Sequence, residues 1–165
     1  MKNFPLQIVT PEGNFFDGEA QMIRLRTVDG DVAILADHMQ YATAIGMGEC
    51  RIVLPDDTER RAACCGGLLV AAGRVRVVAA TVEGAEEIDV PRAQAAQQRA
   101  QAALDAGVQD PLEKAALKER LTRAAVRLRV AQVRGPRVLK RPLFAYSTTK
   151  GKSRMQRCAL ASLFA

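Results

Sequence analysis

The residue pattern changes near Glu86, and this change restricts the chain to a fold of two different parts. Before it, short apolar runs alternate with polar residues and end at clusters of Gly, Pro and Asp. This pattern is typical of antiparallel β structure. After it, 12 of the 45 residues in 89–133 are Ala, the strongest helix former. A sheet domain followed by a helical domain is therefore predicted.

We expect residues 1–88 to form an antiparallel β-sandwich of about 8–10 strands. Segment 23–27 alternates strictly, which places apolar residues on one face and Arg24 and Arg26 on the solvated face. Gly66 and Gly67 are interpreted as a turn or a bulge. The expected strands are 6–10, 23–27, 32–35, 50–54, 60–65, 68–71 and 75–81, with the others less clearly marked.

Residues 89–133 are predicted to form an antiparallel two-helix hairpin. Asp89 and Asp110 are placed to cap the two helices, each with a proline in the first turn, and Gly107 is placed to end the first helix. Small apolar residues three and four positions apart give each helix a narrow stripe for the other. The stripes are Ala93, Ala96, Ala100, Ala103 and Leu104, and then Leu117, Leu121, Ala124, Ala125, Leu128 and Ala131.

The net charge of +6 comes from the last segment of the chain. Residues 134–165 contain eight basic and no acidic residues, whereas residues 1–133 contain 16 basic and 18 acidic residues. Pro136 and Pro142 oppose helix formation, so we expect a basic, disordered tail. The sandwich has few aromatic residues on which bases could stack, so no nucleic acid is expected to bind the two domains.

No catalytic centre or metal site is predicted. His38 is the only histidine, it lies in an expected loop, and the four cysteines have no Cys-x-x-Cys spacing. The longest uncharged run in the first half has 12 residues, fewer than the roughly 18 of a membrane-spanning helix. Because no apolar leader segment is seen, we expect a cytoplasmic protein without direct membrane insertion.

Four segments, in this order, carry a resemblance to a known family. They are 6–12, 30–38 with Thr43-Ala44-Ile45 and Gly48, 66–70, and Ile88-Asp89-Val90-Pro91-Arg92-Ala93. The last segment fits the pattern Ile/Leu-Asp-x-x-Arg-Ala. In these segments the chain resembles the epsilon subunit of F-type ATP synthases, over about residues 3–133. Ala33 stands where the family usually has Gly, Ala36 and Gln40 stand where it has Pro, and the tail has no counterpart.

The resemblance implies a non-catalytic subunit of the central rotor, which couples proton passage to ATP synthesis. Its implied partners are the gamma subunit, the ring of c subunits, and the alpha and beta subunits of the catalytic head. Its implied location is peripheral, on the cytoplasmic face of a bacterial inner membrane. By analogy, Asp31, His38 and Ala42 would contact the ring.

The resemblance also implies a second role, in which the two helices inhibit ATP hydrolysis. Arg120, Arg123 and Arg127 form a basic stripe that would contact an acidic segment of the beta subunits, although the stripe could equally be a solvated face paired with Glu113 and Glu119. No cofactor is expected except regulatory ATP, which some members of the family bind. The candidate ATP-binding residues are Ile88, Asp89, Arg92, Ala93, Arg99, Arg123 and Arg127, although Asp89 could be only a helix cap.

An alternative is a basic-tailed regulatory or nucleic-acid-binding module. It would bind phosphate through the tail, so its affinity would depend on salt and disappear when the tail is removed. A hydrolase ranks third, because no base and nucleophile pair is apparent.

Overall fold

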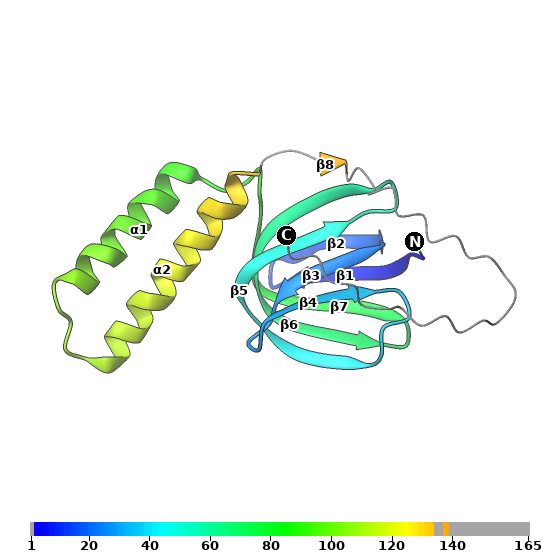
Figure 1. The fold of residues 1–165 in the computed structure, drawn as a ribbon, viewed down its shortest axis with the longest axis horizontal. Helices are drawn as coiled ribbons and strands as arrows, with labels where there is room; N and C mark the ends of the chain where they lie inside the picture. The colour runs from blue at the N-terminus through cyan, green and yellow to red at the C-terminus, as the bar shows by residue number, and fades with distance from the viewer. Residues whose placement is uncertain (1, 134–136, 139–165) are drawn as a thin grey trace, which may run out of the picture.

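The computed structural model describes residues 2–133 and 137–138, and it has a sandwich followed by a helical hairpin, as predicted (Figure 1). The elements in chain order are β1 Phe4–Thr10, β2 Gly13–Ala20, β3 Met22–Arg26, β4 Asp31–Leu35, β5 Tyr41–Val53, β6 Thr58–Ala71, β7 Arg74–Gly84, α1 Val90–Asp105, α2 Pro111–Ala131 and β8 Arg137–Val138. The strand order is β2-β1-β7-β6-β5-β3-β4, and all neighbours are antiparallel except β1 and β7, which are parallel.

The sandwich core is built from the alternating residues of the strands. Ile23 and Leu25 are buried, whereas Arg24 and Arg26 are exposed, as the alternation predicted. Burying the apolar face of each strand supplies most of the favourable free energy of a small β domain. The core side chains that are almost completely buried include Leu6, Ile8, Ile23, Leu25, Ile34, Ile52 and Val77.

Residues 4–84 form seven strands, so the expectation of about 8–10 was too high. The turn or bulge expected at Gly66 and Gly67 lies within the long strand β6, where its register with β7 shifts, and the long strand β5 has a similar shift between Ile45 and Gly48. Strand β2 was not predicted because its sequence, Gly13–Ala20, does not alternate between apolar and polar residues, and most of its residues are exposed at the edge of the sheet.

The register shifts are β-bulges that change which residues of β5 and β7 point outward. Cys65 of β6 pairs with Thr81 of β7, but the next residue, Gly66, pairs with Ala79. Ala80 is therefore the extra residue of β7. Before the bulge, the odd-numbered residues of β7, such as Val77, point inward and are buried. After the bulge, the odd-numbered Glu83 points outward instead. In β5, the odd-numbered Ile45 before the bulge and the even-numbered Cys50 after it both point inward, because the bulge adds one residue between them.

Gly66 is required where the bulge brings β6 close to β7. Its φ is +153°, and a Cβ atom built on it would lie 2.1 Å from the carbonyl oxygen of Val78. Gly67 has no such constraint, because its nearest neighbour to a built Cβ is 4.0 Å away. The double glycine therefore lies within the continuous strand β6, opposite the bulge of β7, and only its first residue is needed for close approach.

The caps of both helices are formed as predicted. Asp89 Oδ1 accepts a hydrogen bond from Arg92 N at 3.0 Å, and Asp110 Oδ1 accepts one from Leu112 N at 3.0 Å. Gly107, with φ of +80°, follows α1 and allows the chain to reverse. The two helices lie side by side and antiparallel (Figure 1). Among the described residues, no helix has both the length and the apolar character needed to span a membrane.

Helix α2 packs on the outer face of β5 and β6 through a small apolar cluster, which we call the docking cluster. It also makes one ion pair with the sandwich: Arg127 Nε donates to Glu83 Oε2 at 2.9 Å, and Arg127 Nη2 donates to Glu83 Oε1. Val126 and Val130, which were left outside the predicted apolar stripe, belong to this cluster with residues of the sandwich. The cluster consists of Ala63, Ala85, Ile88, Val126, Val130 and Ala131.

The predicted disorder of the tail lies outside the described residues, apart from strand β8. This two-residue strand pairs antiparallel with β6, with Val138 opposite Thr58 and Arg137 opposite Glu59. The sequence analysis did not predict a strand there, because it treated the tail by composition and proline content alone.

Replacement of Gly66 by Ala is expected to destabilise the sandwich by on the order of 3 kcal/mol, since a strained φ and a backbone clash add. Gly67→Ala is the matched control and should cost less than about 1 kcal/mol. Urea unfolding followed by circular dichroism measures both. Equal midpoints for the two variants would show that the bulge adapts to a side chain.

Replacement of Glu83 by Gln is expected to loosen the docked hairpin without unfolding either part. The ion pair is partly exposed, so its loss should be worth about 0.5–1 kcal/mol, which is a two- to fivefold faster local opening. Amide hydrogen exchange of residues 126–131 measures this opening. Glu119→Gln is the control, because Glu119 pairs with Arg123 within α2, and unchanged exchange in both variants would exclude a docking role for Glu83.

Candidate functional site

The structure places His38 and Ala42 at one end of the edge strand β4 and Asp31 at the other. Asp31 is the first residue of β4, whereas His38 and Ala42 lie in and just after the loop that leads to β5. The three residues expected to contact the ring are therefore separated by the length of a strand. Asp31 therefore lies apart from His38 and Ala42 in the fold.

Asp31 is held by two arginines of β3. Arg24 Nη2 donates to Asp31 Oδ2 at 2.7 Å, and Arg26 Nη1 donates to Asp31 Oδ1 at 3.2 Å. These hydrogen bonds lower the pKa of Asp31 below its ordinary value. Asp31 is therefore a carboxylate at neutral pH, and its charge is already balanced within the chain.

The loop with His38 has no arrangement for general base catalysis. The imidazole Nδ1 lies 2.8 Å from the carbonyl oxygen of Met39, and the ring packs against Tyr41 with a centroid separation of 5.9 Å. The neighbouring Asp37 accepts a hydrogen bond from Lys2 Nζ at 2.7 Å instead of orienting the imidazole. His38 is thus a loop residue with local contacts.

The buried cysteines are poor nucleophiles. Burial raises the pKa of Cys64 to about 12 and raises that of Cys50 well above its ordinary value, so both are thiols at neutral pH. Within residues 2–133 and 137–138, no group of three or more His, Cys, Asp or Glu side chains could hold a metal ion.

The seven candidate ATP-binding residues do not form an open anion site in this structure. Ile88 and Ala93 are buried, and Asp89 caps α1. Arg123 and Arg127 are bound to the carboxylates of Glu119 and Glu83. Only Arg92 and Arg99 project from α1 as exposed arginines.

The basic stripe of α2 is only partly available to a partner. Arg123 Nη2 lies 2.7 Å from Glu119 Oε1 within the helix, which is one of the pairings weighed in the sequence analysis. Arg127 is directed to the sandwich by Glu83. Arg120 is exposed and has no ion pair among the described residues. In the docked hairpin the stripe therefore offers one unpaired guanidinium.

An outward-facing apolar surface spans β1, β7, β6 and β5, and the sequence analysis missed it. Leu69 is 47% exposed and Val78 is 56% exposed, and they lie on the same face of neighbouring strands. Val9 is the partner of Val78, and Ala42 is the partner of Leu69. We call these four residues the outer apolar surface. The signal in the sequence was the pairing of consecutive apolar residues, Leu68-Leu69 and Val77-Val78, which makes both faces of a strand apolar.

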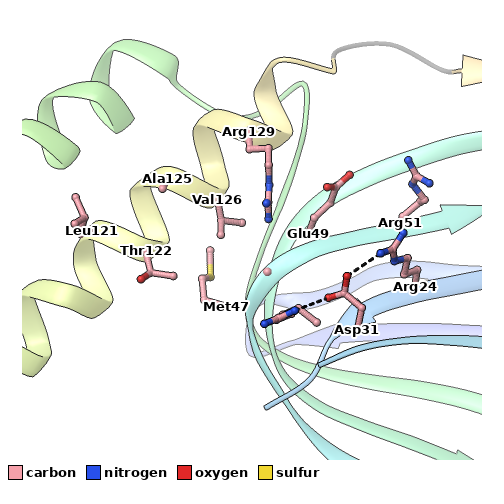
Figure 2. A pocket seen from close by; sticks show the side chains of 12 residues that line it. Arg24, Asp31, Met47, Glu49, Arg51, Leu121, Thr122, Ala125, Val126 and Arg129 are labelled. Carbon is pink, nitrogen blue, oxygen red and sulfur yellow. Dashed lines mark hydrogen bonds and ion pairs between the residues drawn. The ribbon is translucent and has the colours of Figure 1, made fainter. Parts of the chain in front are cut away.

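A groove of about 780 Å³ lies between the sandwich and α2 (Figure 2). Arg24, Arg26 and Arg51 line it from β3 and β5, and Arg129 reaches toward it from α2. We call it the arginine groove. The carboxylates of Asp31 and Glu49 also line it, and its apolar part contains Met47, Leu121, Ala125 and Val126. The alternation in the sequence predicts Arg24 and Arg26 only as solvated residues, since a groove depends on strand register and on the docking of α2.

The fold is similar to subunits of known ATP synthase assemblies. One is a chain in the Euglena gracilis mitochondrial ATP synthase, OSCP/F1/c-ring, with a TM-score of 0.68, 18% identity, and coverage of 78% of this chain and 80% of that chain. Another is a chain in the Tetrahymena thermophila mitochondrial ATP synthase central stalk and c-ring, with a TM-score of 0.53, 15% identity, and coverage of 77% and 95%. These similarities concern the fold.

Curated relatives show a closer similarity in sequence. An ATP synthase epsilon chain of Caldicellulosiruptor bescii is 38% identical over 133 residues, which are 80% of this chain and 96% of the relative. The epsilon chain of Caldicellulosiruptor saccharolyticus is 38% identical over 81% of this chain and 97% of the relative.

Two family models together match almost all of the described chain. The first describes the ATP synthase delta/epsilon chain β-sandwich domain and matches residues 3–85. The second describes the long α-helix domain of the same chain and matches residues 86–132. The protein belongs to the ATP synthase delta/epsilon chain family.

Proposed function

We propose that this chain is a non-catalytic subunit of the ATP synthase central stalk, bound to the gamma subunit through the outer apolar surface. Family membership and the exposure of Leu69 and Val78 support this function together. Large apolar side chains on a flat outer sheet face are costly in water, and a protein partner removes that cost. The gamma subunit is the partner that the family resemblance implies.

The remaining partners are the ring of c subunits and the alpha and beta subunits of the catalytic head. One end of β4 faces the ring in this proposal. His38 and Ala42 are better placed than Asp31 for that contact, since Asp31 is already bound by Arg24 and Arg26. The subunit lies peripherally, at the cytoplasmic face of a bacterial inner membrane, as the named sequence relatives are bacterial.

The helical hairpin acts as a brake on ATP hydrolysis when it leaves the sandwich. The docking cluster is small, so undocking of the hairpin costs little free energy. Undocking also releases Arg127 from Glu83. The released α2 then presents Arg120, Arg123 and Arg127 to an acidic segment of the beta subunits. Regulatory ATP stays a prediction, and it requires Arg123 and Arg127 to exchange their carboxylate partners for phosphate.

Replacement of Leu69 by Glu is expected to abolish co-purification with the gamma subunit while leaving the fold intact, because Leu69 is half-exposed and a charge there opposes an apolar interface. Leu112→Glu is the matched control. Leu112 is 81% exposed at the start of α2, so this variant should bind gamma normally. Normal binding of Leu69→Glu would move the gamma contact away from the outer apolar surface.

Truncation after Asp89 is expected to raise ATP hydrolysis by a complex reconstituted with alpha, beta and gamma subunits, because the inhibitory helices are gone. Truncation after Val133 is the control, since it removes the tail and keeps both helices. The rates of ATP hydrolysis are compared at equal incorporation of each chain. Equal rates for the two truncations would contradict a brake in the hairpin.

A further inference from the structure

Strand β6 extends beyond its neighbour β7 at one end. Gly84, the last residue of β7, pairs with Ala62, so residues 58–61 of β6 lie beyond the pairing with β7. The backbone N of Ala85 still donates to the carbonyl oxygen of Arg61 at 3.0 Å. Past this hydrogen bond, the edge of β6 is open to another strand. We call residues 58–59 the open edge of β6.

The backbone N–H and C=O groups of Glu59 point toward the open edge. Leu54 N donates to Thr58 O at 2.9 Å, so the backbone groups of Thr58 face β5. The backbone groups of successive residues in a strand point to opposite sides, so those of Glu59 face away from β5. Arg61 follows the same alternation, since its carbonyl oxygen accepts from Ala85 N on the side away from β5.

The burial of Glu59 makes a partner for its backbone necessary. The residue is 3% exposed, and a buried N–H or C=O group without a hydrogen bond is costly. Strand β8 pairs antiparallel with the open edge, with Arg137 opposite Glu59 and Val138 opposite Thr58. It therefore supplies the backbone partner that β7 does not reach.

Side-chain contacts within the sandwich hold the open edge in position. Glu59 Oε1 lies 3.1 Å from Arg51 Nε and also binds Arg61. Asp56 Oδ1 accepts hydrogen bonds from Thr58 N at 3.0 Å and from Thr58 Oγ1 at 2.6 Å. Both residues of the edge are thus fixed from their own side of the sheet. A fixed edge loses little conformational entropy when a strand is added to it.

Strand β8 gives the helical hairpin a second attachment to the sandwich. The first attachment is the segment 85–89, which joins Gly84 of β7 to α1. The second is β8, which begins six residues after Ala131, the last residue of α2. Figure 1 shows β8 beside the sandwich, beyond this end of α2. Because Ala62, opposite Gly84, and Glu59 are three residues apart on β6, the two attachments lie about 10 Å apart.

We propose that the open edge of β6 is a strand-binding site occupied by this chain's own residues 137–138, and that β8 acts as a strap that keeps the last turns of α2 on the sandwich. Six residues span at most about 20 Å, so Ala131 stays within that distance of Glu59 while β8 is paired. Helix α2 has 21 residues and is about 30 Å long, so its full separation from the sandwich requires β8 to leave the edge.

The strap acts together with the docking cluster. That cluster contains Val126, Val130 and Ala131 of the last turns of α2, which are the turns nearest the strap. A contact present only in the docked state shifts the equilibrium toward that state. The family model for the helices ends at residue 132, so the strap lies outside the family match. Its effect on the brake rests on the proposed function, whereas the pairing itself does not.

The test is amide hydrogen exchange of the full chain and of a chain truncated after Val133, which keeps both helices. Truncation should speed the exchange of the Glu59 amide about tenfold, because its backbone partner is gone. The exchange of residues 126–131 should rise about fivefold, because α2 opens more often. The amides of Leu68 and Val70, which are buried at the other end of β6, are the internal reference and should not change.

A point variant separates the backbone pairing from the rest of the tail. Arg137→Pro removes the N–H opposite Glu59, so it should reproduce most of both increases. Arg137→Ala is the matched control, because it removes the same side chain and keeps the N–H. Its exchange should stay within twofold of the wild-type chain at both places.

Three results would overturn the proposal. Unchanged exchange of the Glu59 amide after truncation would show that β8 does not occupy the open edge. Faster exchange at Glu59 with unchanged exchange of residues 126–131 would show that β8 does not hold α2. Equal effects of Arg137→Pro and Arg137→Ala would assign the contact to a side chain instead of the backbone. All are measured on the isolated chain and not by co-purification with the gamma subunit, so the failure of the strap and the failure of the proposed function are distinguishable.

Discussion

The two bulges that flank β6 are the constraint on which both candidate surfaces depend. A one-residue shift moves every later side chain of a strand to the opposite face. Without the extra residue Ala80, Glu83 would share the inward face with Val77 and Ala79 and could not reach Arg127. Strand β5 has the same shift before Gly48. In the central strand β6, inward and outward residues alternate without a break. In its neighbours β5 and β7, the alternation shifts by one residue at the bulge.

This change divides each long strand into two functional halves. The outward residues of one half of β5, β6 and β7 are apolar, as Ala42, Leu69 and Val78 are. The outward residues of the other half are charged or contact α2, as Arg51 and Glu83 do. A sandwich that continued its alternation without bulges would bury these charges in its core, at a large cost in desolvation. The bulges therefore allow one sheet to offer an apolar surface to one partner and a polar surface to another.

The helices were predictable because their ends depend on residues close together in the sequence. The strands were less predictable because they depend on pairing between residues far apart in the sequence. Asp89, Asp110 and Gly107 act through hydrogen bonds and dihedral angles within a few residues, so the helix ends follow from the sequence. Gly66 acts through its distance to Val78 on another strand, which the sequence does not contain. The same limit applies to the sites. The arginine groove needs the register of Arg24 with Arg51 and the docking of α2, and neither can be inferred from spacing.

The small size of the docking cluster connects the fold to regulation. Three of its six buried side chains are alanines, whereas the sandwich core contains 17 buried residues with many large apolar side chains. Apolar burial at this scale is worth on the order of a few kcal/mol, so the docked and undocked states can both be populated. One ion pair is then large enough to shift the balance between the docked and undocked states. Because Arg127 of α2 pairs with Glu83 of the sandwich, this charge interaction acts directly on the equilibrium between the docked and undocked states.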